Sequence, residues 1–320
     1  MRKTVGDNLK LFRIRSGFSM AAAGEALSIS APAILKYERN QIIASLERLQ
    51  DFANLYNVTI EDILDVEETI DIKFMNFKCH NRVSDIRKIK IKDLITTKIE
   101  AYFHLLKLAD ITYQNKFGVH MVNTLEEAES LATKLRIFFT IPLKDPISNL
   151  VYLLENNNIM IITLPKNKVT EGFIGYYEII NNVPIIVVPQ AENSYEQRYS
   201  IAKYLGELLI VNNTKKDLLT TQFALSLLIP KTALLEEFDD KRVKIDFREI
   251  EIFSNNYRVS YKHIVQRLKD SHIITPSNAK YLNIHINKNN IKENEYYEVP
   301  YVYDKLKAKL SAKGILKVRK

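Results

Sequence analysis

Short amphipathic segments alternate with tight polar joints over the first part of the chain. Between Val5 and Leu64, apolar residues recur every three or four positions, and joints such as Ser16-Gly17 interrupt the runs. Glycine can adopt the positive φ that ends a helix, so Gly17 marks the end of the first segment. This pattern predicts five short helices over residues 5–64.

The second and third segments each follow a residue that caps helices. Ser19 precedes Met20–Leu27, an alanine-rich stretch that suits close contact with a neighbouring helix. Ser30 precedes Ala31–Arg39, where Pro32 lies in the first turn and its missing amide proton does little harm. Two short helices joined by a tight turn are the arrangement with which many proteins read DNA.

The order and spacing of these segments resemble the Cro/C1-type (XRE) helix-turn-helix family. The resemblance rests on the V-G-x-x-L opening, the F-S joint, the S-I-S turn, the I-L-K-Y-E-R-N helix end, the S-L-E-R-L fourth helix and the closing N-V-T-I-E-D-I-L. Asn40 stands where the family usually has Gly, and asparagine also tolerates the left-handed conformation. Met20 stands where the family often has a Gln that touches phosphate, which puts that contact in question.

The resemblance implies a DNA-binding set on the second and third helices. Its members are Ser19, Met20, Ser30, Ala31, Pro32, Lys36, Arg39 and Asn40. Lys36 is the polar base reader and is able to donate to guanine, whereas Ala31 and Pro32 offer apolar contact, for example with a thymine methyl group. We expect much of the affinity to come from phosphates and some specificity from DNA shape. The alternative is a helical bundle that contacts another protein.

Charge is distributed as a DNA reader requires. The chain has 320 residues, a formal net charge of +8 and a pI near 9.2, and it is long enough for two domains. Residues 1–48 hold eight Lys and Arg against four Asp and Glu, whereas residues 49–72 hold seven acidic residues and no basic one. Net charge alone is weak evidence, but its position agrees with DNA binding by the first half of this region.

Cysteine usage and hydropathy exclude several other classes of protein. The single cysteine, Cys79, cannot form an intrachain disulfide, and Cys79-His80 is too little for a metal site without distant partners. No apolar run approaches the roughly 18 residues that cross a bilayer, and the first residues lack the apolar core of a signal peptide. We therefore expect a cytoplasmic, nucleoid-associated protein with no membrane partner.

Beyond the first domain the pattern predicts a basic connector and then a mixed α and β region. The connector, residues 69–99, becomes helical near Lys92, and either touches DNA beside the operator or is a solvated helix face. The elements expected after it are helices at 95–108, 124–139, 145–155 and 198–210, and strands at 159–164, 173–180 and 183–188. We expect the strands to form a small antiparallel sheet.

A second resemblance covers roughly residues 100–275. The motifs R-x-x-I-A-x-x-L-G-x-L-L, F-A-x-x-L-L-I-P and N-Y-R-V-S-Y-K-H-I-V-Q-R-L follow the predicted helix and strands, and their order is similar to that of the ImmA/IrrE family of gluzincin-type metallopeptidases. That family carries H-E-x-G-H on a helix, where two His bind zinc and the Glu activates water. The resemblance therefore implies a metallopeptidase-like fold.

At the positions of that zinc motif this chain has Lys203, Tyr204 and Glu207, and the third ligand falls near Asp217. A protonated lysine has no lone pair for zinc, tyrosine is a poor base at neutral pH, and one carboxylate cannot hold the metal alone. We predict a degenerate site with no metal, no cofactor and no peptidase activity. Lys203 and Glu207 are four apart, so they either form an ion pair in place of the metal or are two unconnected charges.

Together these patterns predict a mainly α protein with a small α+β domain. A five-helix helix-turn-helix domain at 1–68 precedes the basic connector at 69–99, a gluzincin-like pseudopeptidase domain at 100–285 and a Tyr-rich segment with a basic tail at 286–320. The last segment is interpreted as a partner-binding strand with a mobile tail, or as a second DNA contact.

The function expected from these domains is sequence-specific control of transcription. We expect a dimeric repressor of a prophage or mobile element, whose inactive domain serves sensing, dimerisation or antirepressor binding. Its partners would be double-stranded operator DNA, a second copy of the chain, and an antirepressor protein or small-molecule inducer. Two alternatives remain open: an active zinc metalloprotease that cleaves a repressor, and an antitoxin-type autorepressor that binds a toxin.

Overall fold

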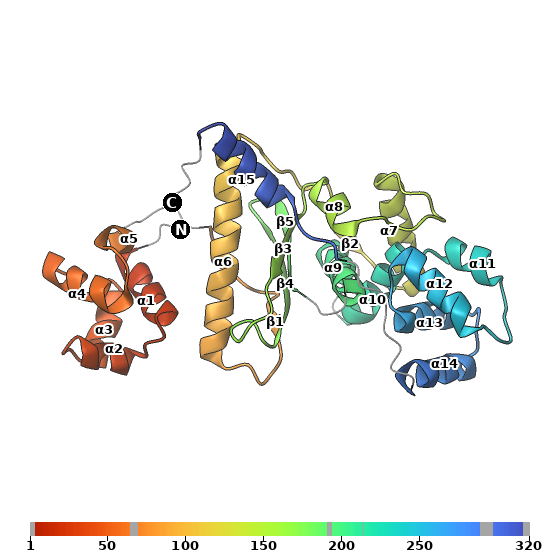
Figure 1. Cartoon of the computed structure of the whole chain (residues 1–320), viewed down its shortest axis with the longest axis horizontal. Helices are drawn as coiled ribbons and strands as arrows, with labels where there is room; N and C mark the ends of the chain where they lie inside the picture. Colours follow the sequence, from red (N-terminus) through yellow and green to blue (C-terminus); the bar gives the residue numbers. More distant parts are fainter. Residues whose placement is uncertain (1–3, 65–69, 191–193, 213, 289–296, 316–320) are drawn as a thin grey trace. The chain divides into compact units, whose positions relative to one another are not determined.

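The computed structural model describes residues 4–64, 70–190, 194–212, 214–288 and 297–315 (Figure 1). Contacts divide the chain into two compact units. The first comprises Met1–Phe74, Cys79–His104 and Asn167–Phe173, and the second comprises Met75–Lys78, Leu105–Lys166 and Ile174–Lys320.

The elements follow one another in this order: α1 (Val5–Arg15), α2 (Met20–Ala26), α3 (Ala31–Glu38), α4 (Leu46–Tyr56), α5 (Ile60–Leu64), β1 (Lys78–Cys79), α6 (Asp85–Leu108), β2 (His120–Met121), α7 (Leu125–Phe138), α8 (Leu150–Glu155), β3 (Met160–Leu164), β4 (Phe173–Ile180), β5 (Val183–Pro189), α9 (Ser194–Leu209), β6 (Ile210–Val211), α10 (Lys216–Leu228), α11 (Lys231–Phe238), α12 (Phe247–Tyr257), α13 (Tyr261–Asp270), α14 (Pro276–Lys288) and α15 (Val302–Ala312).

The five N-terminal helices confirm the prediction made from their caps and joints. The Ser19 hydroxyl accepts a hydrogen bond from the Ala22 amide at 3.0 Å, and the Ser30 hydroxyl accepts one from the Ala33 amide at 3.3 Å. Gly17 has φ +82°, and Asn40 has φ +54°, the left-handed conformation expected of it. The boundaries of α1 to α3 are therefore set by residues next to them in sequence.

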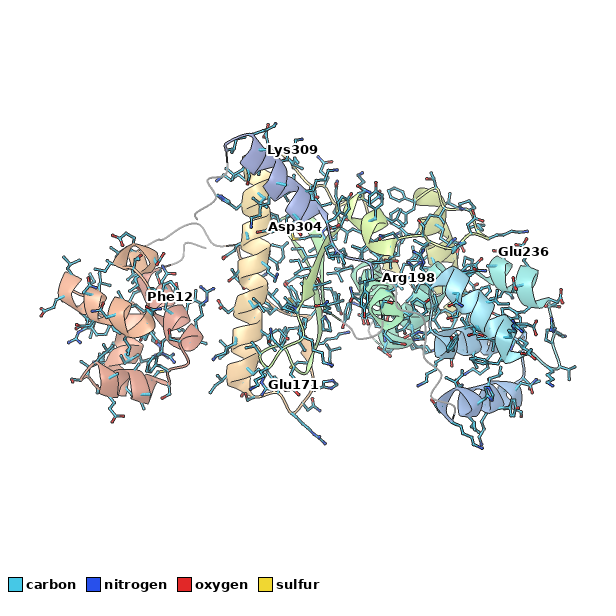
Figure 2. All side chains as sticks on the ribbon, in the orientation of Figure 1. Phe12, Glu171, Arg198, Glu236, Asp304 and Lys309 are labelled. Atoms are coloured by element: carbon cyan, nitrogen blue, oxygen red, sulfur yellow. The ribbon has the colours of Figure 1, made fainter. Side chains whose placement is uncertain are left out.

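The core of this domain forms where the five helices meet. Its fully buried side chains include Leu9, Ile34, Phe52 and Ile63, and Phe12 packs against them (Figure 2). Small residues in α2 allow the close approach that the alanine-rich pattern indicated, because a Cβ on Gly24 would lie 2.6 Å from the Ile29 carbonyl oxygen. The short connection between α2 and α3 depends on this contact.

Helix α6 begins at Asp85, seven residues before the position predicted near Lys92. The stripe that defines it, Ile91, Ile95 and Ile99, is fully buried, but lysines at 88, 90 and 92 hide its start in the sequence. The Ser84 carbonyl accepts the Lys88 amide at 2.9 Å and so opens the helix. The connector is therefore helical over most of its second half.

The sheet is mixed, so the prediction of an antiparallel sheet was only partly right. Its strand order is β1-β4-β5-β3, with β4 antiparallel to β5 and β3 parallel to β5. Asn181 and Asn182, with φ +48° and +63°, form the tight turn between β4 and β5. Strand β5 lies between β3 and β4. After β3 the chain therefore crosses to the far side of β5, forms β4, and returns through the tight turn into β5, which runs parallel to β3.

Helix α8 begins at Leu150, five residues after the predicted start at Asp145. Asn149 is its N-cap and accepts the Tyr152 amide at 2.8 Å. The preceding residues are instead held by the buried Arg136 guanidinium, which donates to the carbonyl oxygens of Pro142 and Asp145. Burial lowers the pKa of Arg136 to about 10. The predicted cap therefore lies in an irregular segment.

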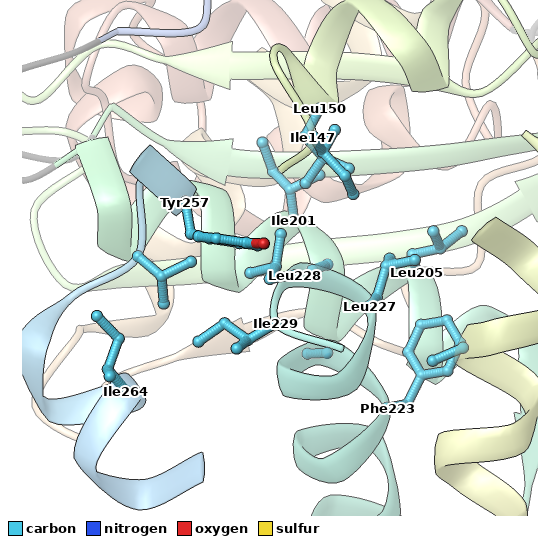
Figure 3. Close-up of a cluster of buried hydrophobic side chains, with 14 of the residues drawn as sticks. Ile147, Leu150, Ile201, Leu205, Phe223, Leu227, Leu228, Ile229, Tyr257 and Ile264 are labelled. Atoms are coloured by element: carbon cyan, nitrogen blue, oxygen red, sulfur yellow. The ribbon is translucent and has the colours of Figure 1, made fainter. Parts of the chain in front are cut away.

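The large core of the second unit is built mainly by α7, α9, α10, α12 and α13 (Figure 3). Leu205 of α9, Phe223 and Leu227 of α10 and Ile264 of α13 are all buried in it.

In the described part of the chain no single helix is long and apolar enough to cross a bilayer. Helices α10 and α11 reach the required length and hydropathy only as a pair, which is bent by 57°.

The C-terminal segment differs from the predicted strand and mobile tail. Residues Val302–Ala312 form α15, on which Asp304 and Lys309 are marked in Figure 2. Leu306 and Leu310, one helical turn apart, are buried. Lysines beside both leucines, at 305, 307 and 309, hid this stripe in the sequence. The remainder of the predicted tail, residues 316–320, lies outside the described residues.

Candidate functional site

The predicted DNA-reading residues lie on the outer side of α2, α3 and their joints. Ser19, Met20, Ser30, Pro32, Lys36, Arg39 and Asn40 are exposed, and Ala31 is half-buried. The other side of α3 is buried through Ile34 and Glu38, which are 1% and 5% exposed. Helix α3 therefore presents a polar, basic side at Lys36 and its C-cap residue Arg39, and it anchors the domain through the opposite side.

Asn40 has a structural role in this domain. Its Oδ1 accepts the Gly6 amide at 2.8 Å, and its Nδ2 donates to the Thr4 hydroxyl at 2.6 Å. Gly6 is needed for this approach, since a Cβ there would lie 2.6 Å from the Glu38 carbonyl oxygen. The side chain of Asn40 thus joins the end of α3 to the start of α1, beside the predicted phosphate contacts.

A buried ion pair that was not predicted from the sequence fixes α3 against α1. Arg13 donates to both carboxylate oxygens of Glu38, with Nη2 to Oε2 at 3.1 Å, and its Nη1 donates to the Phe18 carbonyl at 2.9 Å. The signal was present, because Arg13 follows Leu9 by four residues and Glu38 follows Ile34 by four. Charged residues thus continue the apolar stripes of both helices.

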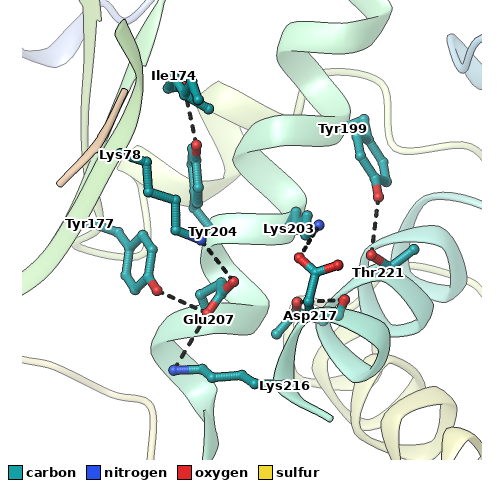
Figure 4. Close-up of polar contacts among 11 residues, drawn as sticks. Lys78, Ile174, Tyr177, Tyr199, Lys203, Tyr204, Glu207, Lys216, Asp217 and Thr221 are labelled. Atoms are coloured by element: carbon teal, nitrogen blue, oxygen red, sulfur yellow. Dashed lines mark hydrogen bonds and ion pairs between the residues drawn. The ribbon is translucent and has the colours of Figure 1, made fainter. Parts of the chain in front are cut away.

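A second group of polar side chains surrounds α9, the helix that carries Lys203, Tyr204 and Glu207 (Figure 4). Lys203 Nζ contacts Asp217 Oδ1 at 2.8 Å, whereas the buried carboxylate of Glu207 binds other partners. These are Lys78 Nζ at 3.0 Å, Lys216 Nζ at 3.5 Å and the Tyr177 hydroxyl at 2.9 Å. The alternative of a Lys203–Glu207 ion pair was therefore wrong, because residues from three other elements supply the partners.

Tyr204 is a packing residue that the strand β4 accommodates. Its hydroxyl donates to the Ile174 carbonyl at 3.1 Å, and its ring stacks on Tyr177 with centroids 5.3 Å apart. A Cβ at Gly175 would lie 2.3 Å from the Tyr204 hydroxyl, so glycine is required there. Burial raises the pKa of both tyrosines; the next cause is the hydrogen bond to Glu207 for Tyr177 and the charge of Glu207 for Tyr204.

The donor set at α9 does not fit a zinc ion. Asp217, proposed as a third ligand, has a side chain 83% exposed, and its hydrogen bond with Lys203 lowers its pKa. Glu207 is already balanced by two ammonium groups, which would repel a divalent cation. Among the described residues no group of three or more His, Cys, Asp or Glu side chains is placed to hold a metal.

Lys78, Lys216 and Tyr177 were not identified from the sequence. Lys78 and Glu207 are 129 residues apart, and no local pattern links them. Lys216 directly precedes the predicted ligand Asp217, but nothing in its spacing indicates which side of α10 it occupies. The Glu207 site exists only because the sheet, α9 and α10 are folded together.

Comparisons with known proteins identify the first domain. Residues 9–63 match the family model described as Helix-turn-helix. No protein of curated function is detectably similar to the chain. The metallopeptidase resemblance of the second unit stays a prediction.

Several solved structures of regulators are similar at low identity. Bacillus thuringiensis PlcR, in complex with the peptide PapR7 and DNA, is 14% identical, with 89% of this chain and 81% of that chain covered and a TM-score of 0.19. S. thermophilus ComR, in complex with DNA and its signalling peptide ComS, is 14% identical, with 98% and 81% covered and a TM-score of 0.19. Streptococcus dysgalactiae Rgg2, a pheromone receptor, is 17% identical, with 96% and 99% covered and a TM-score of 0.18. TM-scores this low do not establish a common fold. The matched family and the geometry of α1 to α5 show that the N-terminal domain is an XRE-type helix-turn-helix domain.

Proposed function

We propose that this chain is a sequence-specific DNA-binding regulator of transcription. The observation that carries the proposal is the helix-turn-helix domain at 9–63, whose third helix exposes Lys36, and Arg39 at its C-cap, and buries its other side. Exposed basic side chains on such a helix can reach base edges and phosphates, which supply specificity and affinity respectively.

The test is operator binding by a Lys36→Ala variant. Selection of bound fragments from a random DNA library, or genome-wide mapping, first provides the operator. Lys36→Ala should then weaken binding about tenfold or more at fixed salt, because a lost bidentate base contact costs roughly 1–3 kcal/mol. Lys10→Ala, an exposed lysine on α1, is the matched control and should change affinity far less.

The two variants also separate base reading from general attraction. If Lys36→Ala binds the operator as tightly as the unchanged chain, α3 is not the base-reading helix. If Lys10→Ala and Lys36→Ala lose equal affinity for operator and for random DNA, both act through phosphates alone. The proposal requires a larger loss on the operator for Lys36→Ala only.

We further propose that the second unit has no peptidase chemistry and acts as a sensor or contact domain. The replacement of a metal-binding set by Lys203, Tyr204 and Glu207 supports this, since none of the three, in these surroundings, is a zinc ligand of the required kind. The buried, fully paired carboxylate at Glu207 gives the unit a site that is polar but not catalytic.

A further inference from the structure

Strand β1 is a short edge strand contributed by the connector. It contains two residues, Lys78–Cys79, and it lies at the outer edge of the sheet beside β4, which has eight. The adjoining residues Met75–Lys78 belong to the second unit although the chain on both sides of them belongs to the first. A small piece of connector has thus been added to the sheet of the second unit.

The side chain of Lys78 enters the Glu207 site from this strand (Figure 4). Its Nζ lies 3.0 Å from Glu207 Oε1. It also lies 5.2 Å from the Tyr177 ring centroid and 5.5 Å from that of Tyr204. A carboxylate with two aromatic faces is a recognition site for an ammonium group, combining ion pairing with cation–π attraction.

We propose that the edge of β4 beside Glu207 is a binding site for an extended peptide that carries a lysine, and that Met75–Cys79 occupies this site in cis. Strand addition would supply main-chain hydrogen bonds, and the Glu207, Tyr177 and Tyr204 groups would select the lysine side chain. This site goes beyond DNA binding and can be tested without DNA.

The occupant in cis is held weakly enough to be exchanged. Two residues give a short ladder, and the Lys78 side chain is 38% exposed, so solvent screens its ion pair. If Lys78 is displaced, the buried carboxylate of Glu207 retains its contacts with Lys216 and the Tyr177 hydroxyl, so its charge still has partners. A longer peptide that pairs along more of β4 gains main-chain bonds that β1 does not make.

Displacement of β1 would change the connection between the DNA-binding domain and α6, because β1 lies between them in the chain. Residues 70–84 lie between the DNA-binding domain and α6, so a peptide that removes β1 releases part of this connecting segment. Tethering gives the cis segment an effective concentration of about millimolar, which a competing peptide must overcome. The site is therefore closed at rest and opens only to a ligand that fits it better.

The test uses the full chain and a fluorescent peptide with the sequence of residues 73–82, in which Ser replaces Cys79. Fluorescence anisotropy should show saturable binding to a Lys78→Met variant, with an affinity about tenfold or more above that for the unchanged chain, whose own strand competes. A peptide with Met in place of Lys78, and a Glu207→Gln chain that also carries Lys78→Met, should each lose about tenfold. Lys203→Met added to Lys78→Met is the matched control and should leave peptide affinity unchanged.

Either of two results overturns the proposal: no saturable binding to the Lys78→Met chain, or equal binding of the lysine and methionine peptides. Hydrogen exchange on the unchanged chain gives an answer even if a variant fails to fold. The His80 amide donates to the Gly172 carbonyl at 2.8 Å, so saturating peptide should speed its exchange. Unchanged exchange at saturation would also reject the site, while operator binding stays a separate question.

Discussion

At the scale of single residues, the side chains around α9 are paired with one another, which supports the prediction that no metal binds there. Glu207 is buried and bonded to Lys78, Lys216 and Tyr177, and Lys203 is committed to Asp217. Binding a zinc ion there would require removing two ammonium groups from one carboxylate. Lys203 and Glu207 instead have partners among the neighbouring side chains.

The corresponding prediction is that metal removal has no effect on the protein. Elemental analysis of the purified chain should find no stoichiometric zinc, and a chelator should leave the thermal midpoint of the second unit unchanged. A zinc ion that binds only the folded state would stabilise it, so its removal would lower the melting midpoint. Stoichiometric zinc together with a lower midpoint after chelation would restore the protease alternative.

Residues whose role depends on their neighbours in sequence could be predicted, and residues with distant partners could not. Ser19, Ser30 and Gly17 act through bonds or dihedrals within a few positions, so the turn chemistry alone revealed them. Lys78 and Lys216 approach Glu207 across the fold, and their sequence surroundings resemble those of any exposed lysine. The residues Lys203, Tyr204 and Glu207 could therefore be singled out from the sequence, but the partners they bind could not.

At the scale of elements, wrong boundaries arose where charge or burial overrode periodicity. The start of α6 was missed because lysines interrupt its buried isoleucine stripe, and the start of α8 because Arg136 holds the preceding residues out of a helix. The direction of β3 against β5 depends on the path of the chain, and the β-branched patterns of the strands do not encode it. Helices α1 to α5 carry their own start and stop signals.

The attachment of α15 gives a prediction about pH. Glu155 at the end of α8 accepts the Tyr301 amide at 2.9 Å and the Val302 amide at 3.4 Å, and its Oε1 has no hydrogen-bond partner in the described part of the chain. Burial raises the pKa of Glu155 from 4.5 to about 7 despite these bonds. Because the attached state holds the proton more tightly, attachment is strongest below about pH 4.5 and weakens as pH rises towards 7.

The free energy of local opening of α15 should fall by about 2 kcal/mol between about pH 5 and pH 7.5. Hydrogen exchange at the amides of α15, corrected for intrinsic rates, measures it. Glu155→Gln is the control, since it has the same shape and does not titrate in this window. Nearby Glu298, which pairs with Arg198 and caps α8, remains in both proteins. An equal pH slope in the Glu155→Gln chain would assign the effect to another group.

At the scale of the whole molecule, the question is how one small reader obtains enough specificity. Lys36 is the one polar base reader that we propose for α3, beside the apolar residues Ala31 and Pro32. Residues 1–48 are basic and residues 49–72 acidic, so the charge that attracts DNA is concentrated in the reader. Phosphate contacts supply affinity without sequence information, which leaves few base contacts for one copy.

We therefore expect two copies to bind one operator. Two helix-turn-helix domains on one face of DNA read half-sites about 10 base pairs apart, so the operator should be a pseudo-palindrome bound by two chains. Inserting about 5 base pairs between the half-sites turns them to opposite faces and should abolish joint binding, whereas about 10 should restore much of it because the faces realign. Light scattering of the complex gives the number of chains, and gel mobility with the spaced operators gives the geometry. One chain per duplex, with affinity independent of spacing, would mean that the single reader suffices and that specificity comes from DNA shape around α3.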